Sequence, residues 1–285
     1  MSRAALYLRL GRVSNMPTVW TNVLAGVVLA GARPPLATIA FLAFALSLFY
    51  VGGMFLNDAF DRDLDAHERP ERPIPSGAVT AGEVFAVGYG LLAAGVALVL
   101  WHAPRPGTAA SAVALGAAIV LYDARHKGNP LGPALMGICR LLVYVTAALA
   151  VSPALGAPVV VGALCLFAYL IGLTYAAKQE SLARLQSLWP LAFLVAPLLH
   201  GLAAAARGIV GAFVYLALFA SVLVAIHLLR GTAPGRFPRA VAGLIAAISL
   251  VDALAIAGAG APGLALVATL GWPATLGLQR WVRGT

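Results

Sequence analysis

Charged residues and cysteines are both scarce in this sequence. Charged side chains make up 10% of the 285 residues and hydrophobic ones 61%, whereas an ordinary soluble domain is about 25% charged. The two cysteines, Cys139 and Cys165, are isolated in apolar segments, so neither a disulfide nor a thiolate metal site is indicated. Mean hydropathy is +0.92, and no repeat or low-complexity linker is visible. The composition excludes a soluble domain and indicates one polytopic membrane domain over residues 1–285.

Long apolar segments are, by contrast, abundant. A helix of about 20 apolar residues spans a bilayer. We predict transmembrane helices at 16–32, 36–60, 82–101, 108–123, 133–152, 157–177, 187–205, 209–229, 238–258 and 262–279. Because Pro273 interrupts the last of these, the predicted fold is an all-α integral membrane bundle of nine to ten transmembrane helices.

Basic residues outnumber acidic ones and give a net charge of +9. Such a charge would suit a nucleic-acid partner, but the lysines and arginines gather in alternate loops, as the positive-inside rule requires. The opposite side of the membrane carries only Arg33, Arg105 and Arg207 before the last predicted helix. We therefore expect no nucleic-acid partner, and a multi-pass protein of the cell's inner or plasma membrane with its N-terminus and polar loops in the cytoplasm.

Acidic side chains are the scarcest charged group, and more than half of them lie in one place. Six of the ten aspartates and glutamates fall within residues 57–71, directly after the apolar segment 36–60. A chain with so little charge that concentrates acid at one membrane edge indicates a cationic ligand there. Mg²⁺ is the leading candidate, because hard dications take oxygen ligands and Mg²⁺ typically combines a few carboxylates with the phosphates of its substrate.

The spacing of these acids favours one face of a helix. If the helix at 36–60 continues through Asp65, then at about 100° per residue Asn57, Asp58, Asp61 and Asp65 fall within an arc of about 100°. Asp63 points to the opposite side. Like charges three and four residues apart disfavour a bare helix, so this acidic stripe indicates a neutralising cation. The alternative is a solvated helix end whose acids only balance neighbouring arginines.

Residues 57–77 carry a resemblance to a known family. They read Asn57-Asp58-x-x-Asp61-x-x-x-Asp65, followed by Arg69-Pro-x-Arg72-Pro-Ile-Pro-Ser-Gly77. This pattern resembles the first signature of the UbiA family of intramembrane prenyltransferases, and the likeness extends over most of the chain. It implies a helical bundle around a central cavity that opens to the cytoplasmic side.

The resemblance also implies a set of ligand-binding residues. Asn57, Asp58, Asp61 and Asp65 are expected to bind Mg²⁺ and, through it, the diphosphate of an isoprenyl donor. The family's arginine and asparagines near its first helix are matched by Arg12, Asn15 and Asn22. The residues expected to bind the diphosphate are Asn57, Arg72, Asp123, Arg125, Lys127 and Asn22.

The loop at 123–132 contributes the basic members of this set. Basic groups near a diphosphate stabilise charge that develops on the leaving group, and the family also has basic residues here, so Arg125 and Lys127 are predicted to bind it. A positive-inside anchor is the alternative. Arg140 lies inside a predicted span, where a charge normally faces a partner or a cavity. Asp123 could be that partner, a metal ligand or a proton-handling group, and these roles stay open.

Residues 175–181 depart from the family pattern. The family usually has a second motif here, Asp-x-x-x-Asp, whereas this chain reads Tyr-Ala-Ala-Lys178-Gln-Glu180-Ser. A lysine could replace a dication as a counter-charge to phosphate, leaving one Mg²⁺ on the first motif and Lys178 on the other side. A surface ion pair with Glu180 is the alternative. Together with residues 123–140, this stretch is similar to the EboC branch of the family.

Asp252 is the remaining acid inside a predicted span. An intramembrane carboxylate is a functional hypothesis by default. No basic partner for Asp252 is evident in the sequence, so a protonated packing role is an equal alternative.

These inferences predict an enzyme, an integral-membrane prenyltransferase. It would use Mg²⁺ to transfer an isoprenyl group from a prenyl diphosphate to a small acceptor, with Asp58, Asp61, Asp65, Lys178 and Arg140 as the catalytic set. An acceptor-free cyclase or hydrolase of prenyl diphosphates would share the acidic stripe. A non-catalytic carrier of a lipid-linked solute would instead place polar groups near the membrane midplane. The sequence indicates no acceptor, chain length or oligomeric state.

Overall fold

The computed structural model describes residues 2–179, 187–231 and 233–282. Over these residues the chain forms α-helices and two 3-10 helices, without a β-strand. The elements are α1 (Arg3–Leu10), η1 (Val13–Asn15), α2 (Met16–Leu29), α3 (Leu36–Phe60), α4 (Arg62–Glu68), α5 (Ala81–His102), α6 (Pro106–Arg125), α7 (Gly132–Val151), α8 (Ala157–Lys178), η2 (Trp189–Val195), α9 (Ala196–Arg207), α10 (Ile209–Arg230), α11 (Arg236–Gly258), α12 (Pro262–Thr269) and α13 (Gly271–Leu278).

Eight helical segments in the described part of the chain are long and apolar enough to cross a membrane. They agree with eight of the predicted spans, with η2 and α9 together forming the one at Trp189–Arg207. The first predicted span forms the 14-residue α2, and the last is broken at Leu270 between α12 and α13. The break precedes Pro273, whose ring clashes with the carbonyl four residues earlier. The predicted all-α membrane fold is confirmed, whereas nine to ten spans are not.

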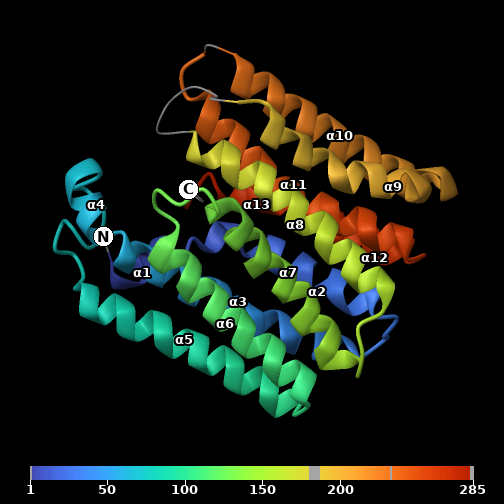
Figure 1. The fold of residues 1–285 in the computed structure, drawn as a ribbon, viewed down its shortest axis with the longest axis horizontal. Helices are drawn as coiled ribbons and strands as arrows, with labels where there is room; N and C mark the ends of the chain where they lie inside the picture. The colour runs from blue at the N-terminus through green and yellow to red at the C-terminus, as the bar shows by residue number, and fades with distance from the viewer. Residues whose placement is uncertain (1, 180–186, 232, 283–285) are drawn as a thin grey trace.

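The helices form one elongated bundle. In Figure 1, α5 and α6 run along one edge, α9 and α10 along the opposite edge, and α2, α7, α8 and α11 lie between them. Among the membrane-length helices α11 is the most buried, and α5 and α10 are the least. All three helices have high mean hydropathy. A helix that is apolar on every face lies either in a protein core, as α11 does, or against lipid, as expected for α5 and α10.

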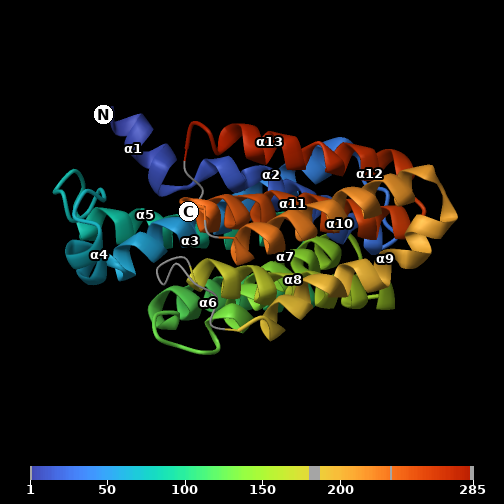
Figure 2. The ribbon, with the colours of Figure 1, turned by 90° about the horizontal axis from the view of Figure 1, so that it is seen from above.

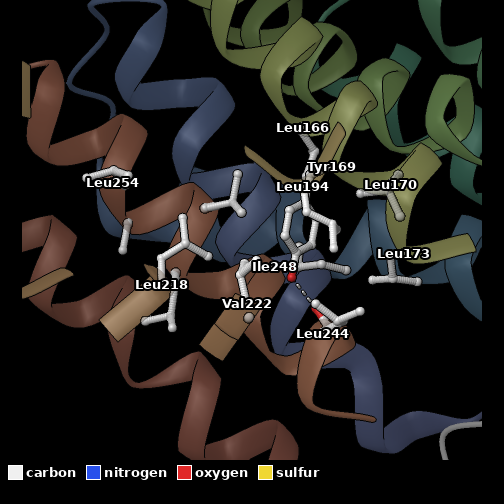
Figure 3. Packing of buried hydrophobic residues seen from close by; sticks show 14 of the residues in the cluster. Leu166, Tyr169, Leu170, Leu173, Leu194, Leu218, Val222, Leu244, Ile248 and Leu254 are labelled. Carbon is white, nitrogen blue, oxygen red and sulfur yellow. Dashed lines mark hydrogen bonds between the residues drawn. The ribbon is translucent and has the colours of Figure 1, made fainter. Parts of the chain in front are cut away.

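Aliphatic and aromatic packing holds the central helices together. Figure 3 shows one part of the core, where side chains from α8, η2, α10 and α11 interlock. The hydroxyl of Tyr169 is buried there and donates a hydrogen bond to the carbonyl of Leu244 at 2.9 Å, which satisfies its polar atom in an apolar surrounding. A second cluster joins α2, α3, α5, α6 and α7, so α2 and α7 contribute to both.

The polar segments gather at one end of the bundle. Figure 2 shows α1, α4 and the end of α13 at this end, whereas the α9–α10 turn lies at the other. A helix cap and two glycines account for turns of the chain at this end. Thr80 caps α5 by accepting a hydrogen bond from the Glu83 backbone N–H at 3.2 Å, and Gly77 and Gly128 adopt positive φ angles that favour glycine. The end of α3, with its acids, is therefore placed among loops.

Candidate functional site

The acidic stripe spans the junction of two helices. The helix predicted to continue through Asp65 divides instead into α3 and α4, with Asp61 between them. Backbone hydrogen bonds from Asp61 to Asn57 and from Asp65 to Asp61 still cross the junction, so the stripe keeps its helical spacing. Asn57, Asp58, Asp61 and Asp65 are all buried. The side chain of Asp63 is 83% exposed, which confirms that it points away from the stripe.

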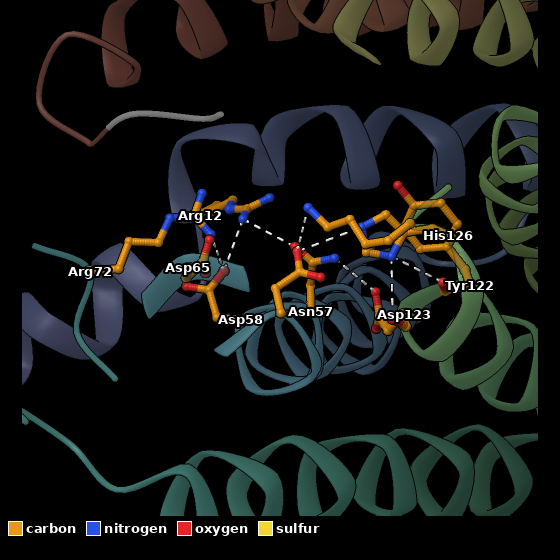
Figure 4. Close-up of polar contacts among 10 residues, drawn as sticks. Arg12, Asn57, Asp58, Asp65, Arg72, Tyr122, Asp123 and His126 are labelled. Atoms are coloured by element: carbon orange, nitrogen blue, oxygen red, sulfur yellow. Dashed lines mark hydrogen bonds and ion pairs between the residues drawn. The ribbon is translucent and has the colours of Figure 1, made fainter. Parts of the chain in front are cut away.

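Cationic side chains from three parts of the chain pair with these carboxylates (Figure 4). Asp58 lies 3.0 Å from Arg12 and 3.5 Å from Arg72. Arg72 also reaches Asp65 at 2.8 Å. Asp61 faces the loop after α6, where Lys127 Nζ lies at 3.0 Å and His126 Nε2 at 3.6 Å. The stripe is therefore neutralised by side chains in this structure.

These partners shift the pKa values of two carboxyls in opposite directions. Burial acts to raise the pKa of Asp61, but the hydrogen bond from His126 and the charge of Lys127 outweigh it and lower that pKa below its ordinary value. For Asp65, burial dominates and raises the pKa although Arg72 opposes it. Asp61 is thus the carboxylate whose charged form the site favours more strongly.

Asn57 joins the stripe to α6. Its Oδ1 accepts a hydrogen bond from Arg12 at 3.2 Å, and its amide nitrogen donates to Asp123 Oδ1 at 3.3 Å (Figure 4). The other oxygen of Asp123 is buried and accepts no hydrogen bond from the described residues. An orphaned carboxylate oxygen on a residue that contacts the stripe through Asn57 is the kind of atom that a cation or a proton would satisfy.

The backbone of Arg12 is held in a rare conformation. Its φ of 42° lies in the left-handed region, and it is the one non-glycine residue with positive φ among those described. The carbonyl of Arg12 accepts a hydrogen bond from the Tyr50 hydroxyl at 3.1 Å. Such a conformation costs about 1–3 kcal/mol, and it persists only where surrounding contacts hold the backbone in place, commonly at ligand-binding sites.

A cavity of about 860 Å³ opens behind these residues. Such a volume is within the range of about 300–1,000 Å³ typical of ligand pockets. Its polar lining includes Arg12, Asn57, Asp61, Asp65, Arg69, Arg72, Asp123, His126, Lys127, Asn129 and Lys178. Its apolar lining includes Val19, Leu46, Phe49, Leu115, Ile119, Val143, Leu170 and Ile248. One chamber therefore combines a charged region with a long hydrocarbon-like wall.

Lys178 and Arg140 line this cavity away from the stripe. Lys178 Nζ donates to the Asn129 carbonyl at 2.7 Å, and a Cβ at Gly132 would lie 2.7 Å from that nitrogen, so glycine leaves the room it needs. Glu180, the alternative partner, lies outside the described residues. Arg140 donates to Asn22 and Thr18 and stacks over Tyr50 at 5.5 Å.

The structure separates the sequence-predicted residues into two groups. Those that line the cavity are Asn57, Asp61, Asp65, Arg72, Asp123, Lys127, Arg140 and Lys178. The other three do not: Asp58 is buried between two arginines, Arg125 is exposed, and Asn22 is fully buried beneath the chamber. Asp123 contacts Asn57 rather than Arg140, so the proposed Asp123–Arg140 pair is not observed.

Sequence reasoning missed His126 as a site residue. It lies one position before Lys127 and three after Asp123, a helical spacing that could have suggested a shared face. Its ring stacks on Tyr122 with a centroid distance of 4.8 Å. The pairing with Asp61 joins segments that are more than 60 residues apart, and no local pattern encodes it.

A model of the UbiA prenyltransferase family matches residues 18–259. The chain belongs to this family. Digeranylgeranylglyceryl phosphate synthase of Natronomonas pharaonis is 33% identical over 165 residues, 58% of this chain and 59% of the relative. The synthase of Methanopyrus kandleri is 35% identical over 127 residues, 44% and 45% of the two chains. A 4-hydroxybenzoate octaprenyltransferase of Shewanella sediminis is 36% identical over 104 residues, 33% and 36% of the two chains.

These matches span about one third to three fifths of the relatives' lengths. Solved UbiA structures resemble the chain over nearly its whole length. A UbiA homolog from Aeropyrum pernix has a TM-score of 0.64 at 17% identity and covers 91% of this chain and 98% of its own. A homolog from Archaeoglobus fulgidus bound to DMAPP and Mg²⁺ has a TM-score of 0.59 at 15% identity and covers 90% and 98%. At these identities the likeness concerns the shared UbiA fold.

A UbiA homolog has been solved with Mg²⁺ bound, so we asked whether the donor atoms at this cavity fit that ion. They do, because Asn57, Asp61, Asp65 and Asp123 supply carboxylate and amide oxygens at the cavity, and Asp123 Oδ2 is orphaned. Within the described ranges no three acidic, histidine or cysteine side chains converge as a ready-made metal cluster. Arginine and lysine occupy the carboxylates instead.

Proposed function

We propose that this UbiA family protein transfers an isoprenyl group from a prenyl diphosphate to a small acceptor within the membrane, in a reaction that depends on Mg²⁺. The observation that carries the proposal is the two-part lining of the cavity. Its charged end suits a diphosphate with a cation, and its apolar wall suits an isoprenoid chain. The names of the relatives, which include a synthase and an octaprenyltransferase, support the same class of reaction.

The ion pairs define how the diphosphate would be received. Arg12, Arg72 and Lys127 now bind carboxylates, and phosphate oxygens are equally good partners for them. On binding, these cations would turn to the diphosphate and release the acids for Mg²⁺. Asn57, Asp58, Asp61 and Asp65 would hold the ion, which when bound neutralises charge on the leaving diphosphate.

Bond cleavage would occur where the two parts of the cavity meet. The C1–O bond of the prenyl diphosphate breaks, and the electron pair leaves with the diphosphate while Lys178 and Lys127 stabilise its charge. The apolar wall excludes water from the allylic cation, so that a nucleophilic atom of the acceptor bonds to C1 and then loses a proton. In this scheme Lys178 replaces a second dication as the counter-charge to phosphate.

The membrane orientation follows from charge. Arg12, Arg72 and Lys127 follow α1, α4 and α6 in the chain, and Lys178 is the last residue of α8; α1 and α4 lie at the end of the bundle that holds the loops (Figure 2). Under the positive-inside rule that end faces the cytoplasm. The cavity would then receive a water-soluble diphosphate head from the cytoplasm while its tail lies in the bilayer.

The direct test is an assay on the purified, detergent-solubilised protein. Labelled prenyl diphosphates of several lengths are incubated with Mg²⁺ and with phenolic or hydroxyl-bearing acceptors, and both diphosphate release and labelled products are measured. Transfer to an acceptor supports the proposal. Release that yields only cyclised or hydrolysed isoprenoid would establish the acceptor-free alternative, and the absence of any Mg²⁺-dependent release would reject both.

Filling the apolar wall is expected to change donor length preference. Val143 lines the cavity about 16 Å along α7 from its first residue, so Val143→Trp should block the path of a long isoprenoid. We expect the kcat/KM ratio of long to short donors to fall by at least about 10-fold. Competition between labelled donors measures the ratio. Ile138→Trp, on an exposed part of the same helix, is the matched control, and an equal shift in it would contradict the assignment.

A further inference from the structure

A buried carboxylate that the proposed chemistry does not use lies beneath the cavity. Asp252 on α11 is 0% exposed and accepts four hydrogen bonds. Asn22 Nδ2 donates to both of its oxygens at 2.9 and 2.8 Å, and the hydroxyls of Thr21 and Tyr144 donate at 2.5 Å each. A fully satisfied buried carboxylate of this kind is a costly arrangement that commonly has a function.

Asn22 connects this hydrogen-bond network to the cavity. Asn22 uses its amide nitrogen for Asp252 and its carbonyl oxygen for Arg140, whose Nη1 donates to it at 2.8 Å. Arg140 lines the cavity, whereas Asn22 and Asp252 do not. The basic partner of Asp252 that is invisible in the sequence is therefore Arg140, reached through Asn22.

The contacts of Arg140 show why this link matters. Its other contacts among the described residues are neutral: the Thr18 hydroxyl at 3.2 Å and the ring of Tyr50 at 5.5 Å. A buried guanidinium needs an opposite charge nearby, and Asp252 supplies it through Asn22. The charge of Arg140, which lines the cavity, is thus compensated by a carboxylate that does not line it.

We propose that Asp252 is a positioning residue that acts through Asn22 to hold the Arg140 guanidinium at a fixed place in the cavity wall. This inference rests on the proposed function for its catalytic consequence. Arg140 would then meet an anionic group of the bound donor or acceptor in a preset orientation, and loss of Asp252 would let it shift. Misplacement of a catalytic group by about 1 Å reduces rates by up to about 100-fold.

The test is a double-mutant cycle between Asp252→Asn and Arg140→Gln, read in two ways. In the assay for diphosphate release we expect Asp252→Asn to lower kcat/KM by about 10- to 100-fold, and to have no further effect once Arg140→Gln is present. In thermal unfolding of the detergent-solubilised protein, the two shifts in Tm should likewise be non-additive. Additive effects in both readouts would overturn the link.

Matched variants separate positioning from general stability. Tyr144→Phe removes one hydrogen bond to the same carboxylate but leaves Asn22 in place, so it should lower Tm while changing kcat/KM less than about 3-fold. Asn22→Ala breaks the link while the Asp252 carboxylate keeps its hydrogen bonds from Thr21 and Tyr144, and it should reproduce the loss of Asp252→Asn. It replaces Asp252→Asn in the test if that variant does not fold. Equal losses in Tyr144→Phe and Asn22→Ala would reject positioning. If the wild type releases no diphosphate, the proposed function fails, and the Tm cycle still tests the link.

Discussion

Replacing Asp61 by asparagine is expected to reduce Mg²⁺-dependent diphosphate release by at least about 100-fold. Asp61 lines the cavity, is 5% exposed, and has its charged form favoured by Lys127 and His126. Asparagine keeps the size of the side chain but removes the charge that would hold Mg²⁺. The substitution should therefore mainly slow cleavage of the C1–O bond, the step in which Mg²⁺ would stabilise the leaving diphosphate.

The measurement is the initial rate of diphosphate release over a range of Mg²⁺ concentrations, with and without chelator. Asp63→Asn is the matched control, because it removes a neighbouring acid whose side chain is 83% exposed and turned away from the stripe. We expect Asp63→Asn to retain wild-type rates. Release that is equal in wild type and Asp61→Asn, or that persists in chelator, would reject the metal role of the stripe.

Replacing Lys178 by glutamine is expected to lower diphosphate release by about 10- to 100-fold, as removal of a charged group near a leaving group does. Lys178 lines the cavity in the stretch where the family resemblance predicts a second acidic motif, and its amine is held by the Asn129 carbonyl at 2.7 Å. Glutamine keeps an N–H donor, on a side chain one bond shorter, while the positive charge is lost.

The effect of Lys178→Gln should appear mainly in kcat, because the charge is needed as the C–O bond breaks. Initial rates over a range of donor concentrations separate kcat from KM. Arg239→Gln is the control, since Arg239 is an exposed cation near the start of α11 that does not line the cavity. An unchanged kcat in Lys178→Gln, or an equal loss in Arg239→Gln, would show that Lys178 only anchors the loop.

Much of the fold could be predicted from sequence because its signals are local. Apolar runs of membrane length located eight helical segments to within a few residues, and Pro273 indicated where the last segment breaks. The helical spacing of the stripe correctly placed Asp63 on the exposed side and Asp58, Asp61 and Asp65 on the buried side. The count of nine to ten spans is not confirmed, because the first predicted span forms an α2 of only 14 residues and the last is divided into α12 and α13.

The membership of the site was predicted less completely. Arg125 and Lys127 are two residues apart with similar chemistry, and only Lys127 turns into the cavity. His126 was missed because its partner Asp61 lies on another helix. Asn22 was expected to bind diphosphate, yet its amide nitrogen donates to Asp252 and its carbonyl oxygen accepts from Arg140, so any influence on a ligand would pass through Arg140.

The amino-acid sequence alone determined that this chain is a helical membrane protein with an oxygen-rich stripe at one membrane edge. Hydropathy and helical spacing depend on neighbouring residues in the sequence, so they can be recognised without knowledge of which segments pack together. The tertiary structure decided which cations neutralise that stripe, that an apolar chamber lies behind it, and that Asp252 reaches Arg140. Apart from the local pairs of Arg72, these contacts join residues 46 to 230 positions apart, and only the packing of whole helices brings such residues within hydrogen-bond distance.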